Sequence, residues 1–234
     1  MRKLGLIGGM SWVSTGIYYD RINRIVQKRA APMASAPLII ESLDFGQLFA
    51  LREEEDWKRA TSVLVDSAKR LEGAGVDGLL IGANSMHKLY DEIAEAIDIP
   101  ILHIADHVGR ALKRSDRKKA ALIGTRNVMT ESFYRKRLVA HGIDLLPPDL
   151  KNVETLERII YDELMVGRVT RDAQRALKTI ITNRAQEGAD SIVLACTELN
   201  LVVDVDANVL PVFDSTRIHC SAAADWILEQ EQDD

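Results

Sequence analysis

Short hydrophobic runs alternate with longer amphipathic stretches along the whole chain. The runs show no regular alternation of polar and apolar positions, which is typical of parallel strands buried on both faces. The predicted strands are Lys3–Gly8, Leu38–Ser42, Gly78–Ala83, Ile99–His103, Ala120–Gly124, Asp144–Leu146, Ser191–Cys196 and Val209–Phe213.

The stretches between these runs carry apolar residues at helical spacing, as the segment around Leu64 illustrates. Hydroxyl side chains that can cap a helix precede several of them, and the predicted N-caps are Ser14, Thr130 and Thr170. The predicted helices are Thr15–Lys28, Asp56–Glu72, Lys88–Ile97, Asp106–Lys113, Glu131–Ala140, Val153–Leu164, Asp172–Gln186 and Thr216–Glu229.

This alternation of strand and helix predicts an α/β fold with parallel sheets flanked by helices. The chain of 234 residues is long enough for two small domains. We expect a first domain at residues 1–99 together with 211–234, and a second at 100–210. The last strand and helix are thus expected to return to the first domain.

The chain contains one sequence pattern twice. Residues 75–85 read GVDGLLIGANS and residues 188–198 read GADSIVLACTE, so Ala83 and Cys196 occupy equivalent positions. A second pair, at Lys3–Gly9 and Lys119–Thr125, is separated by nearly the same distance along the chain. The repeat predicts two related halves that face each other across one cleft, with a thiol on one side and a methyl group on the other.

Right-handed crossovers bring the carboxyl ends of parallel strands to one edge of a sheet, where ligands of such folds bind. Small and polar residues follow the predicted strands at this edge. They are the candidate site residues: Met10, Ala83, Asn84, Ser85, Thr125, Cys196, Thr197 and Glu198.

Cys196 closes an apolar run and is followed by polar residues, which favours a reactive thiol over a buried structural cysteine. Asn84 and Ser85, at the equivalent place in the first half, can offer an amide, a hydroxyl and N–H groups to a carboxylate. The alternative is that they cap the helix that follows, and the two roles are compatible.

Three further motifs could indicate a nucleotide site, a metal site or a proton donor. Gly8 and Gly9 fit no nucleotide-binding pattern, so we attribute them to close approach of the backbone to a small ligand. His103 and His107 are four residues apart, but His103 ends a strand, which argues against a metal site. His87 begins a helix beside the site and is either a proton donor or a packed, hydrogen-bonded residue.

Composition narrows the classes of function. The net charge of −5 gives no basic surface for nucleic acid, and no apolar run approaches the ~18 residues of a membrane span. Two cysteines without close spacing predict neither a disulfide framework nor a zinc site. The first residues lack the pattern of a secretory signal, so we expect a cytoplasmic protein.

At these motifs the chain resembles the aspartate/glutamate racemase family over essentially its whole length. The matching segments are GGMSWVST at 8–15, ANSMH at 83–87, LIGT at 122–125, CTEL at 196–199 and VFDST at 212–216. The resemblance implies a cofactor-independent enzyme of two pseudo-symmetric α/β domains with the active site between them. It also implies a homodimer and an amino-acid substrate.

The resemblance further implies that one residue after each of two central strands works on one face of the substrate's α-carbon. Cys196 matches the second of these residues. Where the family commonly has cysteine, or sometimes threonine, this chain has Ala83, whose methyl group carries no proton. Cys220 lies in a helical pattern away from the motif and does not replace the missing group.

If the chain acts on an amino acid, we expect Asn84, Ser85, Thr125 and Thr197 to hold its α-carboxylate. Arg52 is the candidate for a side-chain carboxylate, because a guanidinium binds carboxylates bidentately, although it equally fits an exposed helix surface. Some family members place a lysine before a glycine that corresponds to Gly167, and this chain has Met165 and Val166 there.

Three hypotheses follow. The first is racemisation of an amino acid, expected to be acidic, with Cys196 on one face and water, Ser85 or His87 acting at the Ala83 face. The second is a single-thiol decarboxylase or isomerase of a small carboxylic acid. The third is a protein that binds an amino acid without chemistry. We rank racemisation first because the second motif and the flanking loops are complete.

Overall fold

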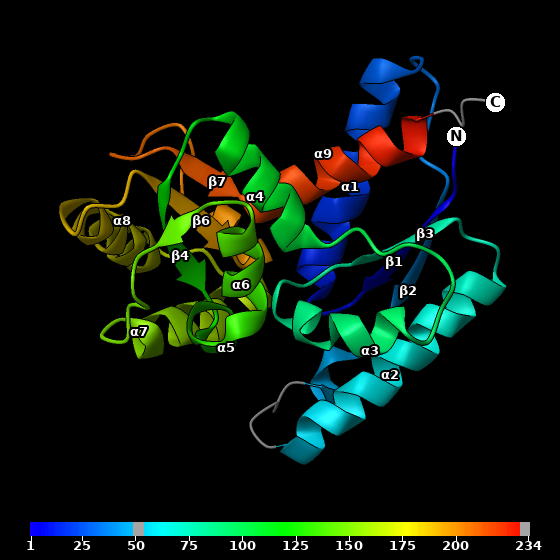
Figure 1. The fold of residues 1–234 in the computed structure, drawn as a ribbon, viewed down its shortest axis with the longest axis horizontal. Coiled ribbons are helices and arrows are strands. Elements are labelled where there is room, and N and C mark those ends of the chain that lie inside the picture. Colours follow the sequence, from blue (N-terminus) through cyan, green and yellow to red (C-terminus); the bar gives the residue numbers. More distant parts are fainter. Residues whose placement is uncertain (49–53, 230–234) are drawn as a thin grey trace. The chain divides into compact units, whose positions relative to one another are not determined.

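The computed structural model describes residues 1–48 and 54–229 and divides the chain into two compact units. Unit 1 comprises Met1–His103 together with the chain from Cys220 onward, and unit 2 comprises Ile104–His219. Each unit has a parallel sheet between helices, labelled in Figure 1. The predicted α/β class with two parallel sheets is therefore confirmed.

The sheet of unit 1 contains β1 (Leu4–Gly8), β2 (Leu38–Ser42) and β3 (Gly78–Ile81) in the order β2-β1-β3. Both pairings are parallel. The predicted strand Ile99–His103 is reduced to a single bridge between Leu79 and Ile101. The backbone contacts of this segment with β3 stop at Leu102, because the chain turns into a helix at Ile104.

Helices cover both faces of this sheet. α2 (Glu54–Gly73) and α3 (Tyr90–Ala94) pack on one face, and α1 (Trp12–Arg29) packs on the other. Short 3-10 turns lie at Phe45–Gln47 and Ser85–Leu89. α1 begins earlier than predicted, since Ser11 and not Ser14 is its N-cap and accepts the Ser14 N–H at 3.4 Å.

The sheet of unit 2 contains β4 (Lys119–Gly124), β5 (Asp144–Leu145), β6 (Ser191–Ala195) and β7 (Val212–Asp214) in the order β5-β4-β6-β7. The last strand was expected in the first domain. Instead β7 pairs in parallel with β6, so it belongs to the second sheet. The expected boundaries at residues 99/100 and 210/211 are corrected to His103/Ile104 and His219/Cys220.

The helices of unit 2 also cover both faces of its sheet. α4 (Ile104–Arg114), α5 (Arg126–Thr130) and α6 (Ser132–Ala140) pack on one face. α7 (Val153–Arg158) and α8 (Arg171–Gln186) pack on the other, and α9 (Ser215–Leu228) begins directly after β7.

Two of the three predicted caps change position. Thr170 caps α8 as predicted, by accepting the Ala173 N–H at 3.1 Å. Thr130 instead ends α5, and Glu131 separates α5 from α6. The predicted helix Val153–Leu164 is not regular either. After α7 the chain forms a π-helical turn at Ile159–Glu163 and a 3-10 turn at Leu164–Val166.

The strand order shows the internal repeat directly. The order β2-β1-β3 in unit 1 recurs as β5-β4-β6 in unit 2, and the bridge at Ile101 takes the place of β7. The helix after each of these last segments packs on the sheet of the other unit. α4 belongs to the core of unit 2, and the second half of α9, from Cys220, belongs to the core of unit 1. The chain therefore crosses between the units twice.

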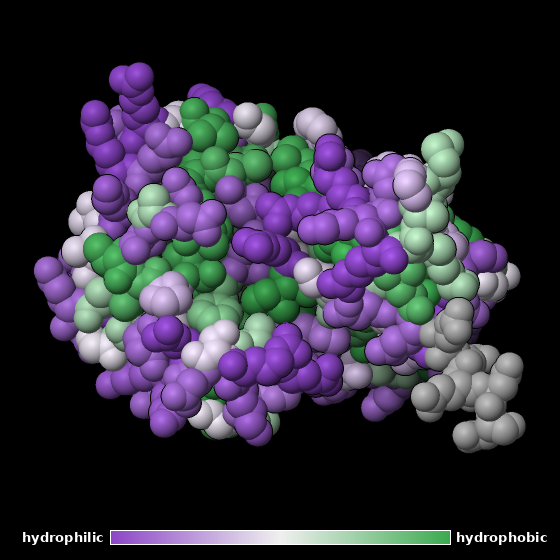
Figure 2. Space-filling model, turned by 90° about the horizontal axis from the view of Figure 1, so that it is seen from above, coloured by the Kyte–Doolittle hydropathy of each residue, from purple (hydrophilic) through white to green (hydrophobic). Residues whose placement is uncertain are grey.

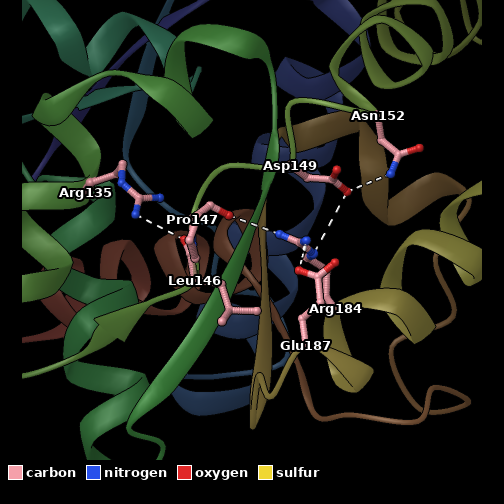
Figure 3. A network of polar contacts seen from close by, with 7 residues as sticks. All are labelled: Arg135, Leu146, Pro147, Asp149, Asn152, Arg184 and Glu187. Atoms are coloured by element: carbon pink, nitrogen blue, oxygen red, sulfur yellow. Dashed lines mark hydrogen bonds and ion pairs between the residues drawn. The ribbon is translucent and has the colours of Figure 1, made fainter.

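A buried arginine anchors α8 to the loop after β5 (Figure 3). Arg184 donates to the carbonyl of Pro147 at 3.0 Å and forms ion pairs with Glu187 and with Asp149, which is 4.0 Å away. Asn152 donates to the same Asp149 carboxylate at 2.8 Å. The Arg184 and Asp149 side chains are only 9% and 8% exposed, and Arg184 is the cation paired with the buried Asp149, while Glu187 also compensates the charge of Arg184.

On the face shown in Figure 2 hydrophilic residues predominate, and hydrophobic residues lie in several groups between them. Within the described part of the chain, every helix is too short or too polar to cross a membrane.

We predict that Arg184→Met lowers the free energy of unfolding by about 3–5 kcal/mol, because it leaves the Asp149 carboxylate buried without its cation. The matched control is Arg175→Met on the same helix, whose ion pair with Asp172 is largely exposed. It should change the free energy by less than ~1 kcal/mol. Urea denaturation of both variants measures the difference, and equal effects would contradict the assigned role of the buried network.

Candidate active site

The second copy of the repeated motif places Cys196 directly after β6. Gly124 of β4 is in register with Ala195, so Thr125 and Cys196 follow neighbouring strands at the same edge of the sheet. Cys196 packs in the same cluster as Ile192 and Leu194, the alternate residues of β6. Its side chain thus lies on the face that α7 and α8 cover.

The Cys196 thiol lies against a buried carboxylate. Its Sγ donates to Oε2 of Glu198 at 3.2 Å, and the Thr197 hydroxyl donates to the same oxygen at 2.6 Å. All three residues are almost fully buried, with 5%, 3% and 1% exposure for Cys196, Thr197 and Glu198. The carboxylate therefore orients both the thiol and the hydroxyl.

Burial raises the pKa of the Cys196 thiol well above its usual value, and the negative charge of Glu198 raises it further. The resting sulfur is consequently a protonated thiol. Once deprotonated it is a strong base, because a high pKa means that the thiolate recaptures a proton readily. This is the property needed to take a weakly acidic proton from carbon.

The first copy of the motif places Ala83 after β3, in an apolar cluster. Ala83 is 5% exposed and packs in the same cluster as Met10 and Met86. Asn84 precedes the 3-10 turn that begins at the half-buried Ser85, but its side chain makes no capping hydrogen bond. The structure thus gives Asn84 no side-chain capping role.

Two of the predicted carboxylate-binding side chains have no internal partner. Both amide atoms of Asn84 and the hydroxyl of Thr125 are buried, and among the described residues none accepts or donates a hydrogen bond to them. Buried polar groups are nearly always paired, so a water or a bound molecule is expected to supply the missing partner. They lie at the carboxyl ends of β3 and β4, as the sequence predicted.

His87 is held against the backbone of position 83. Its Nδ1 lies 2.9 Å from the carbonyl oxygen of Ala83, and because a carbonyl only accepts, Nδ1 carries the proton. The ring is 1% exposed and makes an edge contact with His103, with centroids 4.5 Å apart. Tyr90 makes a second edge contact with His103.

The last candidates from the sequence are Arg52, a metal site and Cys220. Arg52 lies outside the described residues. In the described chain no cluster of three or more histidine, cysteine or acidic side chains is arranged to hold a metal ion. Cys220 is fully buried among apolar residues of unit 1.

The fold itself requires glycine at position 9. A side chain there would collide with the backbone of Leu43, with a Cβ only 2.1 Å from its carbonyl oxygen, and φ is +84°. The Gly9 N–H donates to Thr15 at 2.7 Å. The backbone of Leu43 thus approaches Gly9 too closely for any side chain.

One residue beside Cys196 was missed by the sequence analysis. Tyr161 packs against the cluster that contains Cys196, and burial raises the pKa of its phenol, with the negative charges of Glu157 and Glu198 raising it further. Its position depends on the π-helical turn, which the helical spacing of residues 153–164 did not reveal.

This fold and this pair of strand-end motifs define the class of protein. The chain belongs to the Asp/Glu/Hydantoin racemase family, whose model matches residues 7–223. The predicted resemblance is confirmed.

Individual relatives agree with this assignment. The chain is 26% identical to the broad specificity amino-acid racemase RacX of Bacillus subtilis (strain 168), over 91% of this chain and 92% of the relative. A proposed Asp/Glu racemase from Yersinia pestis, known from a crystal structure, is 40% identical in sequence. The two structures superpose with a TM-score of 0.89 over 98% of this chain and 100% of that one. An aspartate racemase homologue from Pyrococcus horikoshii OT3 is 31% identical, with a TM-score of 0.84 over 98% of this chain and 100% of that one.

We predict that Glu198→Gln lowers the pKa of the Cys196 thiol, because it removes the negative charge that opposes the thiolate. The measurement is the pH dependence of iodoacetamide alkylation, followed by mass spectrometry of the peptide that contains Cys196. The inflection should move to lower pH. Glu157→Gln is the matched control, since this carboxylate acts on Tyr161 but is not among the groups that shift Cys196. An unchanged or higher inflection in Glu198→Gln would contradict the account.

Proposed function

We propose that this protein racemises an amino acid by moving its α-proton, with Cys196 as the proton-transfer group on one face of the α-carbon. Membership of the family and the amino-acid racemase among its relatives support the reaction. The observation that carries the assignment of Cys196 is its thiol, at the end of a central strand and 3.2 Å from the Glu198 carboxylate.

In the proposed step Glu198 accepts the thiol proton and the Cys196 thiolate takes the α-proton of the substrate. The electron pair left on carbon is delocalised into the α-carboxylate. Thr125, which follows the strand next to β6, is the group of unit 2 that we assign to that carboxylate, because its buried hydroxyl has no partner among the described residues. Hydrogen bonds that strengthen as charge develops stabilise the intermediate.

The return of a proton to the opposite face needs a second donor. Position 83 is where the family places it, and Ala83 has none to give. We assign this role to His87, whose ring is tied to the carbonyl of Ala83 at 2.9 Å. An imidazole ring can both donate and accept a proton, so it can replace a thiol at this step.

The expected acidic side chain of the substrate rests on Arg52, which is outside the described residues.

A single-thiol decarboxylase or isomerase is the second candidate, and Ala83 is the observation that favours it. Such an enzyme needs a proton donor on one face only. It would place deuterium from D₂O into a product of decarboxylation or isomerisation and would leave the configuration of free amino acids unchanged.

We predict that Cys196→Ser reduces racemisation of a panel of amino acids by ~10²–10⁴-fold, the usual cost of a lost proton-transfer group. Ala83→Cys should increase racemisation by ~10-fold or more, because it supplies a second thiol at the equivalent position. Chiral chromatography measures both rates, and circular dichroism checks folding. A folded Cys196→Ser variant with unchanged turnover would refute the assignment of Cys196.

We predict that His87→Asn slows inversion by ~10²-fold but leaves α-proton exchange by Cys196 largely intact. An asparagine amide can keep the hydrogen bond to the Ala83 carbonyl, yet it does not transfer a proton. Proton NMR in D₂O measures exchange, and chiral chromatography of the same samples measures inversion. Inversion that stays at the wild-type rate would exclude His87 as the second donor.

A further inference from the structure

A second buried histidine lies against the ring of His87. The imidazoles of His87 and His103 make an edge contact, with ring centroids 4.5 Å apart and an angle of 61° between the ring planes. The two residues are 1% and 4% exposed. Unit 1 therefore contains a buried pair of histidine rings, one of which is held at the backbone of position 83.

Both histidines are anchored to the same strand. The chain leaves β3 and enters the turn that carries His87. Leu79 of β3 also donates its N–H to the Pro100 carbonyl at 2.9 Å and accepts the Leu102 N–H at 3.0 Å. His103 directly follows these bonds, so backbone pairing with β3 fixes the position from which its side chain extends.

One hydrogen bond does not by itself fix the ring of His87. Nδ1 donates to the Ala83 carbonyl at 2.9 Å, so Nε2 is the nitrogen that can exchange a proton with a substrate. An imidazole tied at one nitrogen can still tilt about that bond, and each tilt moves Nε2. The contact with His103 supplies a second point of support, and the two contacts together define the direction of the planar ring.

Tyr90 ties the two histidines together. Its ring contacts His103, with centroids 4.9 Å apart and an angle of 65° between the planes. Tyr90 begins α3, and its backbone N–H donates to the carbonyl of His87. The half-buried Tyr90 thus touches the ring of one histidine and the backbone of the other. Edge contacts between aromatic rings are directional, so the three residues restrain one another more than aliphatic side chains would.

We propose that His103 is a positioning residue for the proton donor His87. Its ring, supported by Tyr90, holds the His87 imidazole so that Nε2 keeps one direction. The proposal rests on the proposed function, since it takes His87 as the donor on the Ala83 face. A reacting group displaced by about 1 Å can lose ~10²-fold in rate, so a contact that only orients the ring has a measurable effect on inversion.

The test compares His103→Leu, which removes the ring, with His103→Phe, which keeps an aromatic ring but has no ring nitrogen. The full chain is incubated in D₂O with L-aspartate, L-glutamate, L-alanine and L-methionine; NMR measures α-proton exchange and chiral chromatography measures inversion. His103→Leu should lower the ratio of inversion to exchange by ~10-fold or more, because exchange by Cys196 does not use His87. His103→Phe should keep most of the wild-type ratio.

His141→Leu is the matched control, because it removes a partly buried histidine of unit 2 that pairs with Asp106, and it should leave the ratio unchanged. Tyr90→Leu should lower the ratio, and Tyr90→Phe should not. Circular dichroism checks the folding of each variant. An unchanged ratio in His103→Leu would overturn the proposal. An equal loss in His103→Leu and His103→Phe would also overturn it, because the ring nitrogens of His103 would then be the active groups.

A second readout does not depend on turnover. Proton–nitrogen NMR correlations of the histidine rings, recorded at a pH at which the imidazoles are neutral, should show His87 as the Nδ1–H tautomer in the wild type and in His103→Phe. In His103→Leu they should show a mixture of both tautomers, and a single Nδ1–H tautomer there would overturn the proposal. If the tautomers mix as expected but the wild type inverts none of the four amino acids, the racemase assignment fails while the positioning assignment stands.

Discussion

The pairing of β6 with β4 is the constraint on which the proposed chemistry depends. It aligns Ala195 with Gly124, so the next residues, Cys196 and Thr125, leave the sheet side by side. The thiol therefore stands at the carboxyl edge because of backbone hydrogen bonds deep in unit 2. The residues after it supply the carboxylate that holds the sulfur, so scaffold and reactive group are specified by one short segment.

Burial then determines the character of the sulfur. Removing the thiol from water raises its pKa, and Glu198 raises it further. The same carboxylate is the local acceptor for the thiol proton, at 3.2 Å. A high pKa lowers the fraction of thiolate at rest but gives a stronger base once the proton has moved. This combination suits removal of a proton from carbon and suits direct nucleophilic attack less well.

The sequence predicted the sheets well, because buried parallel strands have a local signature that does not depend on distant contacts. It misplaced β7, since which sheet a strand joins is decided by pairing with β6, far away in the sequence. It shortened α1 by choosing Ser14 as the cap, because Ser11 and Ser14 are both credible caps by residue type. The predicted strand Ile99–His103 is reduced to a single bridge, because the chain turns into a helix at Ile104.

The candidate site likewise combines residues that a local motif identifies with residues that only the folded structure reveals. The repeated motifs identified Cys196, Ala83, Asn84 and Thr125, and the structure adds which of their polar atoms have no partner among the described residues. Tyr161 could not be found this way, because a π-helical turn changes which residues face the sheet without changing the helical spacing of the sequence. Gly9 was recognised as a close-packed glycine, but only coordinates identify Leu43 as the neighbour.

The most direct test of the central claim is α-proton exchange of the two separated antipodes of one amino acid in D₂O, measured by NMR before inversion accumulates. A lone thiol on one face predicts that wild-type protein exchanges one antipode faster than the other, that Ala83→Cys makes the two rates similar, and that Cys196→Ser loses the fast exchange. Equal exchange of both antipodes by the wild type, or fast exchange that survives Cys196→Ser, would contradict the account.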